Sequence, residues 1–360
     1  MSFKVIHLFE SFRTWLYIIK AQTKIGKSVK ELIKETRDFY RSNIIRVLGA
    51  TGEGWFKFLE SPKTLEEIAG KFQYTDLDFL KEVLDTLVAD TTLETNQSKY
   101  TVKGPVKENR VVPKIFNTAV VEVLESYAQF LPERLRGKYN DFSGGFQLYN
   151  WDETLGLQLY EWIRKSAFIF SGALNRSGKF LDIGCGNGIG TVAIWNYFHE
   201  KNKFYPGTDM EIVGLDPNDQ LLVIARDEFA TQLKKLYHYR DEQIDLFRAH
   251  FPRTFIKGSV TSIPYEDSTF DMVYASQVLH WTKPQVALKE MIRVAKPGGL
   301  IFGTQVVTST AANKFMNLHI KTVKGAEGFF SRANFTSWAL EAGAKKLAMA
   351  TPIMCFKFTK

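Results

Sequence analysis

The sequence has 360 residues, of which 45% are hydrophobic and 24% are charged, and its formal net charge is +8. This composition excludes a disordered or fibrous chain and provides enough apolar material for about two packed domains. Two cysteines exclude a disulfide framework and a zinc cluster. Because we find neither a bilayer-spanning apolar run nor the layout of a signal peptide, we expect a cytoplasmic protein.

Residues 1–41 are predicted to form amphipathic helices. Apolar side chains recur at helical spacing over residues 5–20, and a second helix is predicted over residues 28–41. Two interpretations stay open for the apolar face of the first helix. It packs against a neighbouring domain or a second copy of the chain, or residues 3–20 make a peripheral membrane contact, which Trp and Lys side chains favour.

Residues 42–104 are predicted to form three helices followed by a hairpin. The first helix starts at Ile44, and Thr64 and Glu67 form a capping box for the second. Two short strands around a polar turn follow over residues 92–102. This order is typical of a winged helix. The third helix is strongly acidic, however, so phosphates would repel it and DNA is not an expected partner.

Residues 105–175 are expected to form a helical connector that covers part of a pocket, and strands and helices alternate over residues 176–360. This alternation predicts an α/β fold with a Rossmann-like parallel sheet. Residues 197–210 and 238–254 are longer than such units require and are predicted insertions. The expected strands are Lys179–Ile183, Glu211–Leu215, Phe255–Lys257, Asp271–Ala275, Leu300–Val306, Lys346–Ala350 and Met354–Phe358.

A glycine-rich turn follows the first strand, in the run Leu181-Asp182-Ile183-Gly184-Cys185-Gly186-Asn187-Gly188. Glycines permit a tight turn and a close approach of the backbone to a ligand, and the helix that follows favours negative charge at its start. A dinucleotide fingerprint needs its third glycine three positions after the second, whereas here Ile189 occupies that position.

Four further motifs follow in order. Asp216 ends the second strand, where a carboxylate can accept hydrogen bonds from both hydroxyls of a ribose or, in the alternative, cap a turn. The later motifs are Lys257-Gly258-Ser259-Val260, Ala275-Ser276-Gln277-Val278-Leu279-His280-Trp281 and Lys296-Pro297-Gly298-Gly299. Over residues 179–305 the chain resembles class I S-adenosylmethionine-dependent methyltransferases.

This resemblance implies S-adenosyl-L-methionine as the cofactor and no metal ion. Ser259 departs from the family, which often has an Asp there to contact the adenine amine. The part of the chain with these motifs is similar to quinone-biosynthesis enzymes, and its combination with a winged helix resembles small-molecule O-methyltransferases. A small, largely apolar acceptor (quinone, phenolic, polyketide or lipid-like) and a homodimer through the N-terminal region follow from these two likenesses. The implied cofactor-binding residues are Asp182, Gly184, Cys185, Gly186, Gly188, Asp216, Pro217, Ser259, Val260, Ser276 and Gln277.

Two histidines are candidates for removing a proton from the acceptor. His280 comes just after the fourth strand, near the place where the resembled O-methyltransferases carry a catalytic His. His319 is predicted on a lid helix after the fifth strand and is the second candidate. Packing is the alternative role for both. Methylation of a macromolecule and a non-catalytic cofactor-binding regulator stay open as alternative functions.

Overall fold

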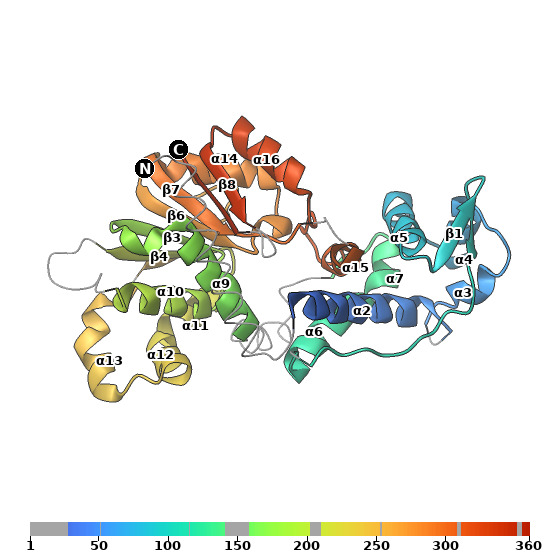
Figure 1. The fold of residues 1–360 in the computed structure, drawn as a ribbon, viewed down its shortest axis with the longest axis horizontal. Coiled ribbons are helices and arrows are strands. Elements are labelled where there is room, and N and C mark those ends of the chain that lie inside the picture. Colours follow the sequence, from blue (N-terminus) through green and yellow to red (C-terminus); the bar gives the residue numbers. More distant parts are fainter. Residues whose placement is uncertain are drawn as a thin grey trace. The chain divides into compact units, whose positions relative to one another are not determined.

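The computed structural model describes residues 28–50, 52–114, 116–140, 158–201, 210–252, 254–307, 311–350 and 355–360. They divide into two compact units (Figure 1). Unit 1 holds the described parts of 152–306 and 330–360, and unit 2 holds those of 27–151 and 307–329. The helix predicted over residues 5–20 and the membrane contact predicted for residues 3–20 lie outside the described residues.

Unit 1 is built on a seven-stranded sheet in the order β5-β4-β3-β6-β7-β9-β8. β5, β4, β3, β6 and β7 are parallel, and β9 pairs antiparallel with both β7 and β8. The strands are β3 (Lys179–Ile183), β4 (Glu211–Asp216), β5 (Thr254–Lys257), β6 (Phe270–Ser276), β7 (Ala295–Thr304), β8 (Lys345–Ala350) and β9 (Cys355–Thr359). Each predicted strand overlaps an observed one, and the predicted Rossmann-like α/β fold is confirmed.

The central strands β3, β4 and β6 are mostly buried, because helices cover the sheet. Phe168 of α9 shows how this covering works. Its ring centroid lies 6.0 Å from Phe180 of β3, 5.3 Å from Tyr274 of β6 and 5.0 Å from Phe302 of β7. The helices of unit 1 are α9 (Gln158–Ser171), α10 (Ile189–His199), α11 (Asp219–Asp227), α12 (Phe229–Tyr237), α13 (Asp241–Phe247), α14 (Pro284–Val294) and α16 (Arg332–Glu341), with short 3-10 turns η1 (Ala173–Asn175), η2 (Arg248–His250) and η3 (Leu279–Trp281).

The predicted insertion over residues 238–254 forms α13 and η2 and packs against α10. The Trp195 indole N–H donates to the carbonyl oxygen of His250 at 2.9 Å, and the rings of Trp195 and Phe251 lie 5.2 Å apart. This segment therefore shares the core of unit 1. Of the other predicted insertion, residues 202–209 lie outside the described residues.

Unit 2 is helical apart from one hairpin. The hairpin and the Thr64–Glu67 capping box are present as predicted, and Lys63 adds a bridge to Tyr100 of β2. The elements are α2 (Val29–Leu48), α3 (Trp55–Phe58), α4 (Leu65–Phe72), α5 (Leu77–Ala89), β1 (Leu93–Asn96), β2 (Lys99–Val102), α6 (Thr118–Gln129), α7 (Leu131–Leu135) and α15 (Ala311–Ile320). No helix within the described ranges has both the length and the apolar character that a bilayer span requires.

α2 continues without a break from Val29 to Leu48, so the prediction of a helix end at residue 41 and a new start at Ile44 was wrong. The polar residues there indicated a break, but other parts of the unit satisfy them. Arg41 pairs with Asp90 and donates to the Thr92 hydroxyl at 2.8 Å, and the Ser42 hydroxyl donates to a backbone carbonyl oxygen one turn earlier at 2.8 Å. Nothing in this stretch therefore has to end the helix.

The chain returns to unit 2 after β7, because α15 packs against α2. Glu82 of α5 accepts hydrogen bonds from Asn317 at 2.8 Å and from Lys321 at 2.6 Å. The side-chain oxygen of Asn317 (Oδ1) accepts a hydrogen bond from the backbone N–H of Phe329 at 2.6 Å. The domain division proposed from the sequence placed this segment in 176–360, whereas its contacts group it with the N-terminal residues.

Candidate functional site

Strand order sets the ligand-binding edge of unit 1. β4 follows β3 in the chain and lies on one side of it, whereas β6 lies on the other side. In an open α/β sheet, such a reversal leaves a crevice beyond the carboxyl ends of the strands. The predicted site residues that follow β3, β4, β5 and β6 all lie at this edge.

Three glycines shape the turn after β3. Gly184, Gly186 and Gly188 have φ angles of 69°, 55° and 85°, which residues with a Cβ avoid. The N–H of Gly184 donates to Leu215 O of β4 at 2.7 Å, and the N–H of Gly188 donates to Cys185 O at 3.0 Å. These bonds tie the turn to β4 and place its last glycine at the start of α10.

The three glycines differ in the space around them. A Cβ at Gly184 would come within 2.5 Å of the Val278 side chain, and one at Gly188 would come within 2.9 Å of the Ala225 side chain. A Cβ at Gly186 would meet nothing within 4 Å. The turn is therefore packed at both ends and open at Gly186, where a ligand can lie against the backbone.

Asp216 closes this turn from the end of β4. Its two carboxylate oxygens accept hydrogen bonds from the backbone N–H groups of Gly186 and Asn218, each at 2.9 Å. Burial raises the pKa of this carboxyl. Each oxygen keeps a further lone pair for a ligand hydroxyl. The structure thus brings together the glycine turn and Asp216, and Pro217 follows as an exposed residue.

Asp182 lies beneath the turn rather than on it. Its side chain is buried and accepts a hydrogen bond from the Thr191 hydroxyl of α10 at 2.6 Å. Burial raises the pKa of Asp182 to about 7, while the Thr191 bond and the Arg164 guanidinium oppose this shift. The carboxyl group therefore links β3 to α10.

The loop after β5 carries Ser259 and Val260. The hydroxyls of Ser259 and Thr261 lie 2.8 Å apart, and the Ser259 oxygen also accepts from the backbone N–H of Thr261 at 3.2 Å. The Val260 side chain is buried. Ser259 thus stabilises a local turn, and its neighbour anchors that turn in the core.

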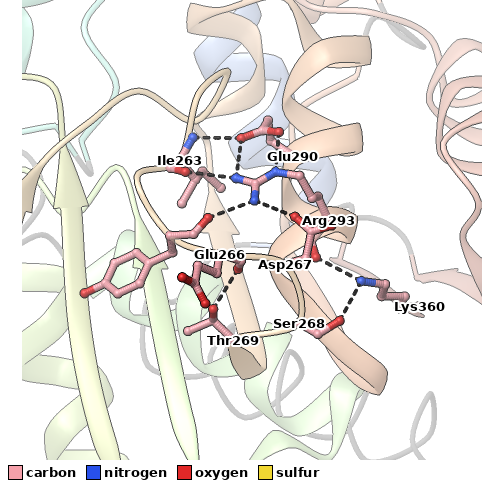
Figure 2. Close-up of polar contacts among 9 residues, drawn as sticks. Ile263, Glu266, Asp267, Ser268, Thr269, Glu290, Arg293 and Lys360 are labelled. Carbon is pink, nitrogen blue, oxygen red and sulfur yellow. Dashed lines mark hydrogen bonds and ion pairs between the residues drawn. The ribbon is translucent and has the colours of Figure 1, made fainter.

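Arg293 of α14 holds the rest of this loop (Figure 2). Its guanidinium donates to the carbonyl oxygens of Ile263 at 2.9 Å and Tyr265 at 2.8 Å, and to Asp267 at 2.9 Å. Glu290 pairs with the same guanidinium at 2.7 Å and accepts from the backbone N–H of Ile263 at 2.8 Å. A charged group bonded to several loop carbonyls fixes the path of the loop.

Hydrogen bonds join the ends of β6 and β7. The Ser276 and Thr304 hydroxyls lie 2.7 Å apart, and the backbone N–H of Gln277 donates to Thr304 O at 2.9 Å. The Gln277 side chain donates to the Thr304 hydroxyl at 3.2 Å and accepts from the backbone N–H of Val306 at 3.1 Å. Both predicted residues therefore shape the crevice through bonds within the chain.

His280 follows on the 3-10 turn η3 and is 4% exposed. Its Nδ1 lies 3.2 Å from the side-chain nitrogen of Gln305, and its ring lies 4.7 Å from the ring of Trp281. Burial lowers the pKa of His280 to about 3, and the Gln305 contact opposes this shift. The imidazole is therefore neutral at physiological pH.

Comparisons with known proteins agree with this geometry. Residues 181–303 match the family model described as a methyltransferase domain. This segment is therefore a methyltransferase domain. An uncharacterized methyltransferase of Schizosaccharomyces pombe is 33% identical over 129 residues, which are 36% of this chain and 40% of that protein.

Two further likenesses concern the methyltransferase domain and the whole fold. Demethylmenaquinone methyltransferase of Bacillus mycoides is 28% identical over 47% of this chain and 60% of its own length. The chain thus spans less than two thirds of either relative. The CurJ carbon methyltransferase has a similar fold over 98% of both chains, with a TM-score of 0.65 and 16% identity.

The residues at the edge of the methyltransferase domain fit S-adenosylmethionine, the cofactor of this class. Gly186 leaves open space against the backbone, and Asp216 keeps acceptor capacity beside it. The buried Asn187 amide adds a donor, since its nitrogen has no hydrogen-bond partner among the described residues. These groups would hold the ribose and the methionine part of the cofactor.

His319 lies in unit 2, outside the methyltransferase domain. Its Nδ1–H donates to Phe315 O of the same helix at 2.9 Å, and its ring meets the Tyr40 ring edge-on at 4.8 Å. Burial lowers the pKa of His319 to about 4. Among the described residues, His319 therefore makes the contacts of a side chain that packs in the core of unit 2.

Three polar residues of unit 1 were not predicted from the sequence. Arg164 is buried on the sheet-facing side of α9 and pairs with Glu161 at 3.1 Å. Gln305 contacts His280, and Arg293 holds the loop after β5. Arg164 could have been recognised, because a charged residue among the apolar positions of the predicted helix indicates a buried charge. The contacts of Gln305 with His280 and of Arg293 with the loop carbonyls join residues far apart in the sequence, and no local pattern indicates them.

Proposed function

We propose that the chain transfers a methyl group from S-adenosylmethionine to a small, largely apolar acceptor. The observation that carries this proposal is the closure of the glycine turn onto Asp216, with open space left at Gly186. When bound, the cofactor supplies an electrophilic methyl group on a sulfonium centre. The chain's own residues then hold the ribose at Asp216 and line the crevice up to His280, so that an acceptor can be aligned and water excluded.

Two observations support the chemistry of the acceptor. Aromatic residues make up 14% of the chain, and the demethylmenaquinone methyltransferase that resembles it is named for a quinone substrate. A largely apolar acceptor such as a quinone, phenolic, polyketide or lipid-like compound agrees with both observations.

As part of the same proposal, the N-terminal unit is a winged helix, which its helices, hairpin and Lys63–Tyr100 bridge support. We propose that this unit pairs two copies of the chain, as its resemblance to small-molecule O-methyltransferases implies. Sedimentation velocity of the full chain tests the pairing, and a monomer at all concentrations would contradict it.

Isothermal titration calorimetry with S-adenosylmethionine and its demethylated product tests the cofactor site. We expect the full chain to bind both, and Asp216→Ala to weaken binding by at least about tenfold, because ribose hydroxyls lose a charged acceptor. Asp219→Ala is the matched control, since the side chain of Asp219 is 63% exposed and pairs with Lys257 at the surface. Binding of NAD without binding of either sulfur compound would overturn the proposal.

A further inference from the structure

Gln305 occupies a position from which its side chain can control His280. It follows β7 directly and is fully buried. Its side-chain nitrogen lies 3.0 Å from the carbonyl oxygen of Val306 and 3.2 Å from Nδ1 of His280. The backbone around it is fixed, because Gln277 binds both Thr304 and Val306.

These two contacts determine which way the Gln305 amide faces. A backbone carbonyl oxygen only accepts hydrogen bonds, so the group 3.0 Å from Val306 O must be the NH2 end of the amide. The opposite orientation would set two oxygens against each other in a buried site. The second N–H of the same nitrogen then points to His280.

The proton on His280 follows from this orientation. Because the Gln305 nitrogen donates, Nδ1 of His280 must accept with its lone pair. A neutral imidazole with an unprotonated Nδ1 carries its proton on Nε2. The low pKa that burial imposes keeps the ring in this neutral form.

We propose that Gln305 is a positioning residue that holds His280 as the neutral Nε2–H tautomer, so that neither ring nitrogen can take a proton from the methyl acceptor, because Gln305 engages Nδ1 and Nε2 already carries a proton. The tautomer stands independently of the proposed methyl transfer, while its consequence for the acceptor rests on that function. An acceptor that needs this imidazole to remove its proton is not served by the arrangement.

Nitrogen NMR of the full chain with ¹⁵N-labelled histidine reads the tautomer directly, without any activity. The His280 signals are assigned as those lost in His280→Gln. We expect the pattern of an Nε2–H tautomer that does not titrate between about pH 5.5 and 8. A wild-type spectrum with the proton on Nδ1 would overturn the proposal.

Two variants test whether Gln305 sets the tautomer. In Gln305→Glu the carboxylate accepts from Nδ1–H, so the proton moves to Nδ1 and the pKa of His280 rises. Gln305→Met has a similar size and no donor, and we expect mixed tautomers. Gln232→Met, at another buried glutamine of unit 1, is the matched control and leaves the His280 signals unchanged. Unchanged His280 signals in folded Gln305→Met would contradict the proposal, even if Gln305→Glu does not fold.

Calorimetry separates this inference from the function on which its consequence rests. Absence of S-adenosylmethionine binding with an intact Nε2–H pattern would refute the proposed methyl transfer and leave the tautomer standing. Cofactor binding together with an Nδ1–H pattern would refute the role of Gln305 alone.

Discussion

At the scale of single residues, the methyltransferase domain contains a carboxyl group that is costly to ionise. Asp182 is buried between β3 and α10, and burial raises its pKa to about 7. The ionised form is therefore less stable in the folded protein than in the unfolded chain. The stability that neutral Asp182 contributes is fully present below about pH 4 and is lost as the pH rises through about 7.

Asp182→Asn tests this linkage. We expect the free energy of unfolding of the wild type to fall between about pH 5 and pH 8, and this fall to be smaller in the variant. Asn keeps an oxygen that accepts from the Thr191 hydroxyl, so the packing is preserved. Urea unfolding at the two pH values gives the difference. Asp227→Asn, at an exposed position, is the control, and an equal pH slope in Asp182→Asn and the wild type would contradict the assignment.

At the scale of elements, one guanidinium joins α14 to the loop after β5. Arg293 bonds two carbonyl oxygens of the loop and two carboxylates (Figure 2). This loop also contains Ser259 and Val260, the residues predicted to contact the cofactor. Losing Arg293 should therefore affect both stability and cofactor binding.

Arg293→Met removes the charged donors and keeps much of the side-chain volume. We expect the free energy of unfolding to fall by about 2 kcal/mol, because hydrogen bonds to a charged group are lost while the side chain is partly exposed. Cofactor affinity measured by calorimetry should fall as well. Arg248→Met, which breaks an exposed pair with Asp245, should change stability by about 0.5 kcal/mol or less. A similar loss in both variants would show that Arg293 has no special role.

The sequence predicts elements well where the pattern is local. The alternation of buried strands, the capping box at Thr64 and the glycine turn are all visible within a few residues. The length of α2 is not, because Arg41 finds its partners Asp90 and Thr92 far along the chain. The same holds for the site, where the position of Asp216 is predictable and the contact between Gln305 and His280 is not.

At the scale of the whole molecule, the last helix of unit 2 is α15, which follows the rest of that unit by more than 150 residues of sequence. Asn317 of α15 both donates to Glu82 and accepts from the backbone N–H of Phe329. Removing this side chain deletes the hydrogen bond from the Phe329 N–H and the one to Glu82. The cost of such a loss is about 1 to 3 kcal/mol.

Asn317→Ala should therefore destabilise unit 2 and leave unit 1 nearly unchanged. Hydrogen exchange read by mass spectrometry is the appropriate measurement, because it reports each segment separately. We expect faster exchange in α15 and α2, with unchanged protection in β3 and β6. Thr336→Ala, on an exposed part of α16, serves as the control. Equal acceleration in β3 would contradict the division into two units.

The route of α15 also has a consequence for synthesis on the ribosome. Domains generally form from the N-terminus onward as the polypeptide emerges. Here unit 2 lacks α15 until residues 307–329 have been translated. By that time most strands of the unit 1 sheet have already left the ribosome's exit tunnel. The face of α2 that α15 contacts must stay unaggregated during that interval, and a nascent chain halted before residue 307 would leave this face uncovered.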